Sequence, residues 1–368
     1  MTTTVAVVGG GALGVTAAAD LARGADVTLY ERGDLAAEST GRAAGVCYDA
    51  FASQTDAAVG KRAQERFREF PDVFTDCPYV WLARMGDDRR AAAIREQVSR
   101  MVEHGVDVSL ADSTDLAEWF PALETDDIAV AAIARNAGYA DTVGYVEAMA
   151  ERARTAGASI RTHTPVAVRT DSPKIITSND ERAFDAVLVA AGAHTKRVLA
   201  EAGIALALKP YRVQALVTEP MPASENLPMC FDATGDFYFR PHTGGLLVGD
   251  GTERTESDPD EWTREASAGF VESARERLAE RVRGSVEEIR EAWAGLCTAT
   301  PDGDPLLGEV RPGIFVASGF HGHGFMRAPA LGETIAEQVL GGDGIPRFDP
   351  TRFEGSEEFE IVAGMDIE

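Results

Sequence analysis

Three glycines close to the start of the chain, Gly9, Gly11 and Gly14, have the G-x-G-x-x-G spacing of a phosphate-binding turn. The apolar run 5–8 precedes them and the alanine-rich stretch 12–23 follows, which predicts a buried strand, a turn and a helix. In such a unit the first glycine permits the sharp turn, the second lets a pyrophosphate approach the backbone, and the third lets the helix pack against the strand. The N–H groups at the start of the helix then face the phosphates.

A carboxylate closes the second apolar run of this unit. Residues 27–30 predict another buried strand, and Glu31 follows it, where a carboxylate can accept hydrogen bonds from ribose hydroxyls. Three glycines alone would indicate no more than a turn. The flanking strands, the helix and Glu31 therefore carry the prediction of a dinucleotide site. The pattern does not distinguish NAD from FAD.

The composition disfavours several classes of partner. The 368 residues carry 60 acidic against 35 basic side chains, a formal net charge of −25, and the lysines are Lys61, Lys174, Lys196 and Lys209. Such a field repels nucleic acids and anionic lipids. The acidic, lysine-poor balance resembles that of halophilic proteins, although an ordinary acidic surface is the alternative interpretation.

Neither the cysteines nor the hydropathy pattern indicates a metal site or a membrane anchor. Cys47, Cys77, Cys230 and Cys297 are scattered without C-x-x-C spacing, which disfavours a zinc site and a disulfide framework. No apolar stretch approaches membrane-spanning length, so we expect a cytoplasmic protein with no integral membrane segment.

Hydrophobic periodicity predicts helices and strands along the rest of the chain. Segment 34–50 reads as a loop and the start of a helix. The predicted helices cover 90–104, 145–157, 259–283 and 327–342, and the predicted strands cover 79–83, 186–190, 211–219, 237–241, 245–249 and 313–320. The strand at 186–190 leads into Ala191 and Gly192, whose small size lets a backbone approach a cofactor.

Three pieces of the sequence point to one family. They are the N-terminal unit with ESTGRAAG, the central GASIRTHTPVAV with FDAVLVAAGAHT, and WAGLCTATPDGDPLLG with IFVASGFHGHGFMRAPALGE. In this order they resemble the FAD-dependent amino-acid and amine oxidoreductases of the D-amino acid oxidase superfamily, which include glycine oxidase and sarcosine oxidase. The resemblance covers nearly the whole chain.

The resemblance implies an α/β protein with two discontinuous domains. A Rossmann-type FAD-binding domain would take residues 1–46, 141–205 and 294–355. A second, α+β substrate domain built on an antiparallel sheet would take the two insertions, 47–140 and 206–293.

The resemblance also implies which residues hold FAD. The pyrophosphate would lie against Gly9, Ala12, Leu13 and Gly14, and the ribose and adenine against Glu31, Arg32 and Val166. The flavin would be lined by Thr40, Arg42, Ala43, Ala44 and Gly45, and its pyrimidine edge by Gly322, His323, Gly324, Phe325 and Met326. Reduction leaves negative charge at that edge, which a glycine-rich turn opening a helix would stabilise. His323 would add charge if protonated, or else be a packed or capping side chain.

The activity implied by the family is oxidation of a C–N bond, with hydride passing to flavin N5 from the carbon that bears the amine. The substrate would be an amino acid or secondary amine of the sarcosine, glycine, proline or D-amino acid type. Its carboxylate needs a cation, yet Cys297 and Gly322 replace arginines of glycine oxidase, and Met326 replaces a lysine of sarcosine oxidase.

Four arginines are replacement candidates for the missing cations: Arg240, Arg212, Arg42 and Arg327. Arg240 is the first choice, because it should lie on the substrate sheet facing the flavin, although a solvated strand-end arginine is equally compatible with its position. Tyr238 alternates with Arg240 and should point to the same face, where it would bind substrate or merely pack.

Two further differences from the sarcosine oxidase sequence concern the attachment of the flavin and its reaction with oxygen. Sarcosine oxidase carries FAD on a cysteine that aligns with Gly295, and Cys297 lies two residues further on, roughly 7 Å along a strand. We therefore expect non-covalent FAD. Leu247 stands where sarcosine oxidase has an oxygen-activating lysine, which favours a dehydrogenase that passes electrons to a quinone or an electron-transfer protein over one that uses O2.

Other functions remain open at this point. An FAD-dependent 2-hydroxy-acid or polyol-phosphate dehydrogenase would use similar chemistry, and a non-catalytic flavin subunit of a heteromeric complex would also lack substrate-binding cations. A nicotinamide-dependent dehydrogenase is disfavoured, because it would leave the C-terminal GHGF segment unexplained.

Overall fold

A six-stranded sheet contains the N-terminal unit of the protein. The computed structural model describes residues 2–284, 288–362 and 364. The strand order is β19-β20-β13-β1-β2-β9, with β1 (Thr4–Val8) and β2 (Asp26–Tyr30) near the centre. The other strands are β9 (Ser159–Arg161), β13 (Ala186–Val189), β19 (Leu306–Arg311) and β20 (Ile314–Ser318). All neighbours are parallel except β19 and β20, as expected for a Rossmann-type sheet.

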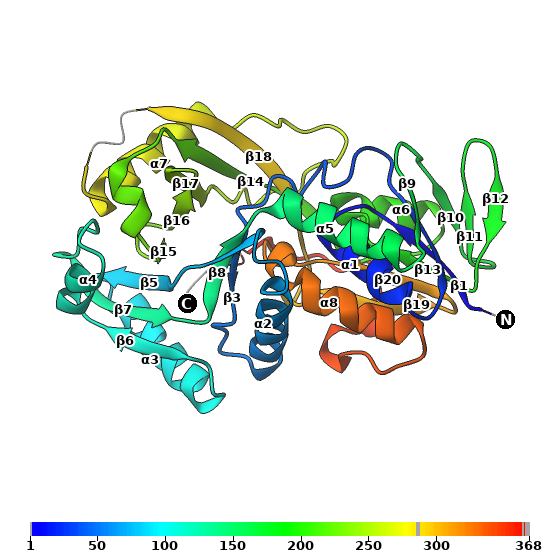
Figure 1. Cartoon of the computed structure of the whole chain (residues 1–368), viewed down its shortest axis with the longest axis horizontal. Helices are drawn as coiled ribbons and strands as arrows, with labels where there is room; N and C mark the ends of the chain where they lie inside the picture. Colours follow the sequence, from blue (N-terminus) through cyan, green and yellow to red (C-terminus); the bar gives the residue numbers. More distant parts are fainter. Residues whose placement is uncertain (1, 285–287, 363, 365–368) are drawn as a thin grey trace.

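Small residues let helix α1 (Ala12–Leu21) pack closely against its neighbours α5 (Thr142–Thr155) and α8 (Gly324–Val339) beside this sheet (Figure 1). A Cβ atom on Gly14 would lie 2.0 Å from the carbonyl oxygen of Gly9, and one on Gly332 would lie 2.6 Å from Cγ2 of Thr16. Both contacts are far shorter than real Cβ contacts, so the α1 packing requires glycine at these positions.

A second sheet of eight strands lies at the other end of the molecule (Figure 1). Its order is β18-β14-β17-β16-β15-β5-β7-β6, and every pair is antiparallel except β15 with β5. The strands are β5 (Tyr79–Arg84), β6 (Val108–Ala111), β7 (Ile128–Ala134), β14 (Lys209–Thr218), β15 (Met229–Asp232), β16 (Phe237–His242), β17 (Gly245–Asp250) and β18 (Ile289–Ala299). The two sheets confirm the predicted fold class, a Rossmann-type unit joined to a part built on an antiparallel sheet.

Within the described residues, two three-stranded sheets and five further α-helices accompany the two large sheets. One sheet joins β3 (Val46–Tyr48), β8 (Ala137–Ala140) and β4 (Phe74–Asp76), and the other joins β10 (Ala167–Arg169), β11 (Lys174–Ile176) and β12 (Glu181–Ala183). The helices are α2 (Gln54–Phe67), α3 (Asp88–Glu103), α4 (Ser113–Trp119), α6 (Thr195–Glu201) and α7 (Ala268–Arg281).

The structure corrects two predicted helices. The charged helix expected over 259–283 is α7, which begins only at Ala268, after Ser267 caps it by accepting from the N–H of Phe270. The preceding segment stays non-helical because its carbonyl groups at Thr263 and Glu265 accept hydrogen bonds from Arg212. The helix start expected within 34–50 is a run of turns followed by β3, and α2 begins later, after the cap residue Ser53.

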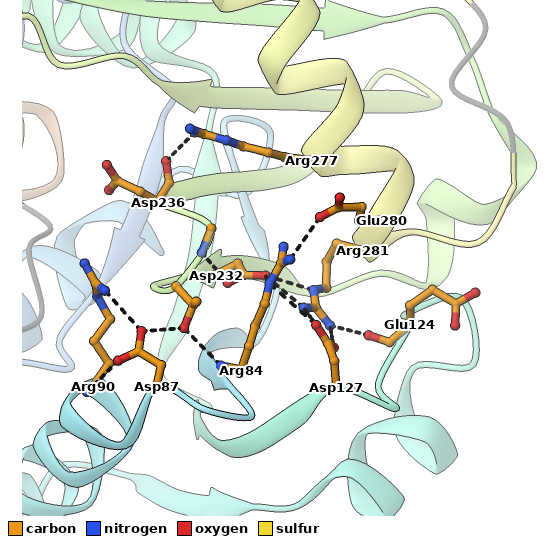
Figure 2. A network of polar contacts seen from close by, with 12 residues as sticks. Arg84, Asp87, Arg90, Glu124, Asp127, Asp232, Asp236, Arg277, Glu280 and Arg281 are labelled. Carbon is orange, nitrogen blue, oxygen red and sulfur yellow. Dashed lines mark hydrogen bonds and ion pairs between the residues drawn. The ribbon is translucent and has the colours of Figure 1, made fainter.

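A buried ionic network fastens β15, β5 and α7 together (Figure 2). Asp232, at the end of β15, accepts from Arg281 at 2.9 and 3.0 Å and from Arg84 at 2.9 Å. Arg281 also donates to Asp127 at 2.8 and 3.0 Å. These contacts fix the end of β15, a strand whose residues Met229 to Phe231 face the cavity described next.

Candidate functional site

A cavity of about 520 Å³ is lined by residues of both large sheets. Its wall is formed by the glycine turn after β1, the ends of β2 and β13, the start of α8, and parts of strands β14, β15, β16 and β18. Segments far apart in the sequence therefore build one site.

The glycine turn fits the pyrophosphate of a dinucleotide. Gly9 has φ +118°, and a Cβ atom there would lie 2.3 Å from the carbonyl oxygen of Ala190, so only glycine is accommodated. Gly11 is the N-cap residue of α1, and the helix begins at Ala12, whose N–H donates to the Thr40 hydroxyl at 3.1 Å. This places the positive end of α1 on the cavity wall.

The acidic residue after β2 anchors the turn. The Glu31 carboxylate accepts from the N–H groups of Gly10 at 2.7 Å and Gly33 at 2.8 Å. Glu31, Arg32 and Val166 all line the cavity, and Arg32 is paired with Glu38 at 3.3 Å. Gly14 does not line the cavity, so its role is the close helix–strand contact and not direct contact with a ligand.

The residues that the glycine spacing, the strand at 186–190 and the resemblance assigned to the cofactor come together on the same walls. Those that line the cavity are Gly9, Gly11, Ala12, Leu13, Thr40, Arg42, Ala43, Ala44, Gly45, Ala191, Gly192, Gly322, His323, Gly324, Phe325 and Met326. Turns rich in small residues, which come from separate parts of the chain, therefore line one cavity. This arrangement can hold an extended cofactor.

His323 is a neutral side chain at the start of α8. It occupies the N-cap position without a side-chain capping hydrogen bond, and its Nε2 lies 3.3 Å from the Tyr48 hydroxyl. Burial lowers the pKa of His323 to about 3, with the nearby Arg327 charge acting in the same direction. Positive potential at this end of the cavity therefore comes from the start of α8 and from Arg327, and not from an imidazolium.

The structure brings Tyr238 into the cavity wall but not Arg240. The Arg240 guanidinium is buried, donates to the carbonyl oxygens of Ala44 and, at 2.7 Å, Pro241, and lies 4.8 Å from the centre of the Tyr139 ring. Burial lowers its pKa. The alternation along β16 places Tyr238 and Arg240 on one face. The Arg240 guanidinium, however, already donates a hydrogen bond to the carbonyl oxygen of Ala44, so it is not free to bind a substrate carboxylate in this structure.

Several cavity residues were missed because no spacing in the sequence connects them. Tyr48 from β3 and Tyr79 from β5 stack with ring centroids 4.5 Å apart and an interplanar angle of 2°. Both line the cavity, together with Phe231 and Trp293. Cys297 also lines it, and burial raises the pKa of its thiol to about 11, which keeps the sulfur protonated at neutral pH.

Within residues 2–284, 288–362 and 364, no group of three or more histidine, cysteine or acidic side chains is placed to hold a metal ion. Over the same ranges, no helix has the length and apolar character needed to cross a membrane.

Comparison with known proteins identifies the family. A model of the family described as "FAD dependent oxidoreductase" matches residues 4–338, so this chain belongs to that family and is an FAD-dependent oxidoreductase.

Individual relatives cover almost the full chain. A glycine oxidase of Geobacillus kaustophilus is 27% identical over 365 residues, which is 91% of this chain and 92% of the relative. A monomeric sarcosine oxidase of an Arthrobacter species is 26% identical over 302 residues, 76% of this chain and 77% of the relative. The crystal structure of L-proline dehydrogenase from P. horikoshii superposes with a TM-score of 0.89 at 27% identity, covering 97% of this chain and 99% of that one.

Proposed function

We propose that this protein oxidises the C–N bond of an amino acid or secondary amine. Bound FAD would supply the hydride acceptor. The glycine oxidase, sarcosine oxidase and L-proline dehydrogenase relatives support this substrate class. The observation that carries the proposal is the single cavity that joins the glycine turn after β1 to the start of α8 and to the face of the antiparallel sheet.

FAD binding is assigned to the residues of the six-stranded sheet and its turns. The segments 1–46, 141–205 and 294–355 would form the FAD-binding domain, and 47–140 and 206–293 the substrate domain. Strand β18 crosses the boundary between these domains at residues 293 and 294, and residues 295–298 of that strand line the cavity. The pyrophosphate would lie at Gly9 to Leu13, the ribose at Glu31, and the isoalloxazine between 42–45 and 322–326.

We further propose that the protein is a dehydrogenase whose electrons go to a quinone or an electron-transfer protein. Leu247 is buried in an apolar cluster with Ala44, Tyr238 and Trp293, three residues that line the cavity. No lysine belongs to the described cavity wall. A site without such a cation offers little stabilisation to an oxygen anion forming in low dielectric.

Anaerobic addition of a panel of amines to the purified holoenzyme tests the activity. The panel contains glycine, sarcosine, L- and D-proline, D-alanine, L-lactate and glycerol 3-phosphate. Bleaching of the flavin absorbance by an amine or amino acid supports the proposal and identifies the substrate. Bleaching by lactate or glycerol 3-phosphate alone, or by no compound, would overturn it.

A further inference from the structure

A second cavity, of about 500 Å³, adjoins the main one, and we call it the side cavity. The two share six wall residues: Tyr48, Tyr79, Phe231, His321, His323 and Gly364. The side cavity is also lined by the exposed residues Asp302, Gly303 and Glu360. It therefore leads from the surface to the wall of the main cavity.

The side cavity is lined by a buried arginine whose hydrogen-bond donors are unused. Arg327 lies on α8, one turn after His323, and its side chain is 7% exposed. Its guanidinium is 3.2 Å from Oδ1 of Asp56 and 4.7 Å from the centre of the Phe51 ring. In the described part of the chain the Arg327 side chain donates no hydrogen bond, and its buried Nε has no partner. A buried donor without an acceptor costs free energy, and the cost is larger on a charged group. A hydrogen-bond acceptor that bound beside Arg327 would therefore be stabilised.

The other three arginines that sequence reasoning offered are already engaged. Arg212 donates to Thr263 and Glu265 and pairs with Glu253, and Arg240 donates to Ala44 and Pro241. Arg42 donates to the carbonyl oxygen of Ala294 at 3.3 Å through a terminal nitrogen, although its buried Nε, like that of Arg327, has no partner. Of these four side chains, only Arg327 makes no hydrogen bond to the described residues.

We propose that the side cavity admits the substrate and that Arg327 binds its carboxylate, an inference that deepens the proposed function and rests on it. A carboxylate presents two oxygens in the spacing of a guanidinium fork. Asp56 keeps the arginine paired when no ligand is bound. His323 lines both cavities and precedes Arg327 by one helical turn, about 6 Å along the axis. A carboxylate held by Arg327 thus directs the amine-bearing end of the substrate toward the main cavity.

Calorimetric titration of the flavin-loaded protein with propionate and with propionamide tests this assignment. Propionate should bind, and propionamide, which has the same shape without the charge, should bind at least tenfold more weakly. Arg327→Met should raise the Kd for propionate by about 10- to 100-fold, the loss expected for hydrogen bonds to a charged group. The Kd of Arg327→Lys for propionate should lie between those of the wild type and Arg327→Met, because lysine keeps the charge but not the planar pair of donors.

Arg66→Met is the matched control. Arg66 is also buried, at 3% exposed, and lies on α2, but its guanidinium is fully paired with Asp20 at 2.7 and 3.1 Å and lines neither cavity. This variant should lose stability without losing propionate affinity. If Arg327→Met does not fold, the double variant Arg327→Met with Asp56→Leu removes both charges and leaves no buried ion unpaired.

A folded, flavin-loaded variant lacking Arg327 that binds propionate within twofold of the wild-type Kd would overturn the inference. So would a wild-type protein that does not distinguish propionate from propionamide. Failure of the proposed function has a different signature, a wild-type flavin that no amine or amino acid bleaches. The substrate titration adds a second readout, because loss of Arg327 should raise the apparent Kd for the amino acid far more than it lowers the limiting rate of flavin reduction.

Discussion

Arg281 and Asp232 form an ion pair in which both side chains are fully buried, with the Arg281 nitrogens 2.9 and 3.0 Å from one Asp232 oxygen. Removing Arg281 leaves the buried Asp232 carboxylate with Arg84 as its remaining charged partner, so part of the cost of burying that charge is no longer offset. We expect Arg281→Met to lower the free energy of unfolding by about 3–5 kcal/mol. Urea titration followed by circular dichroism measures this loss. Arg275→Met, on the exposed side of the same helix, should cost less than about 1 kcal/mol, and equal losses in both variants would contradict the explanation.

The buried histidines make stability depend on pH. An unfolded histidine has a pKa near 6.5, whereas burial lowers the pKa of His323 to about 3 and the pKa values of the half-buried His194 and His242 to about 4. Between these values the unfolded state binds more protons, so stability is lost as pH falls below about 6.5, at up to ~1.4 kcal/mol per unit and per histidine. Urea titrations between pH 8 and pH 5 should show this slope.

His323→Gln should flatten that slope. A wild-type stability that rises as pH is lowered from 7 to 5 would contradict the buried, neutral state of His323.

Arg240→Met tests whether this residue positions residues 42–45 of the cavity wall or binds substrate. Because the guanidinium donates to the carbonyl of Ala44, next to Gly45 on the cavity wall, its loss should free residues 42–45. We expect weaker FAD retention, measured as flavin lost on dialysis, with a smaller change in the substrate KM. A large rise in KM with FAD retention unchanged would restore Arg240 as the carboxylate ligand.

Oxygen reactivity tests the role of Leu247, whose side chain is 2% exposed. Reduced wild-type enzyme mixed with aerated buffer should reoxidise slowly. Leu247→Lys should accelerate reoxidation at least tenfold, since one cation near the reacting oxygen is worth several kcal/mol in low dielectric, on the order of a tenfold rate per 1.4 kcal/mol. Leu247→Met, similar in size and uncharged, is the control. Wild-type reoxidation within milliseconds, with stoichiometric peroxide, would refute the dehydrogenase assignment.

Flavin attachment is tested by acid precipitation. Cys297 lies in the cavity wall, and burial raises the pKa of its thiol to about 11. The resemblance to sarcosine oxidase implies that the attachment cysteine of that enzyme corresponds to Gly295 and not to Cys297. Acid should therefore release yellow FAD into the supernatant. A pellet that stays yellow, and turns white in Cys297→Ser, would establish a covalent bond to that sulfur.

The features predicted from the sequence are those that local chemistry determines. The glycine spacing required a tight turn at Gly9 and a helix from Ala12, and both are present. Period-two alternation placed Tyr238 and Arg240 on one face of β16, but it contains no information about what approaches that face. Only the folded chain brings the Ala44 carbonyl to Arg240, Tyr48 onto Tyr79, and Arg327 into the side cavity beside Asp56.

The parallel pairing of β15 with β5 has a consequence for the order of folding. The side chains of Arg84 and Asp232, at the ends of these strands, are bonded across 148 residues of sequence. When the N-terminal half of the chain leaves the ribosome, β5 has its antiparallel neighbour β7 but lacks its other partner, so one edge of a hydrophobic strand stays open. Such long-range pairings slow folding and leave an edge available to other chains. We expect aggregation during synthesis to increase with the time during which the β5 edge remains unpaired before β15 is synthesised.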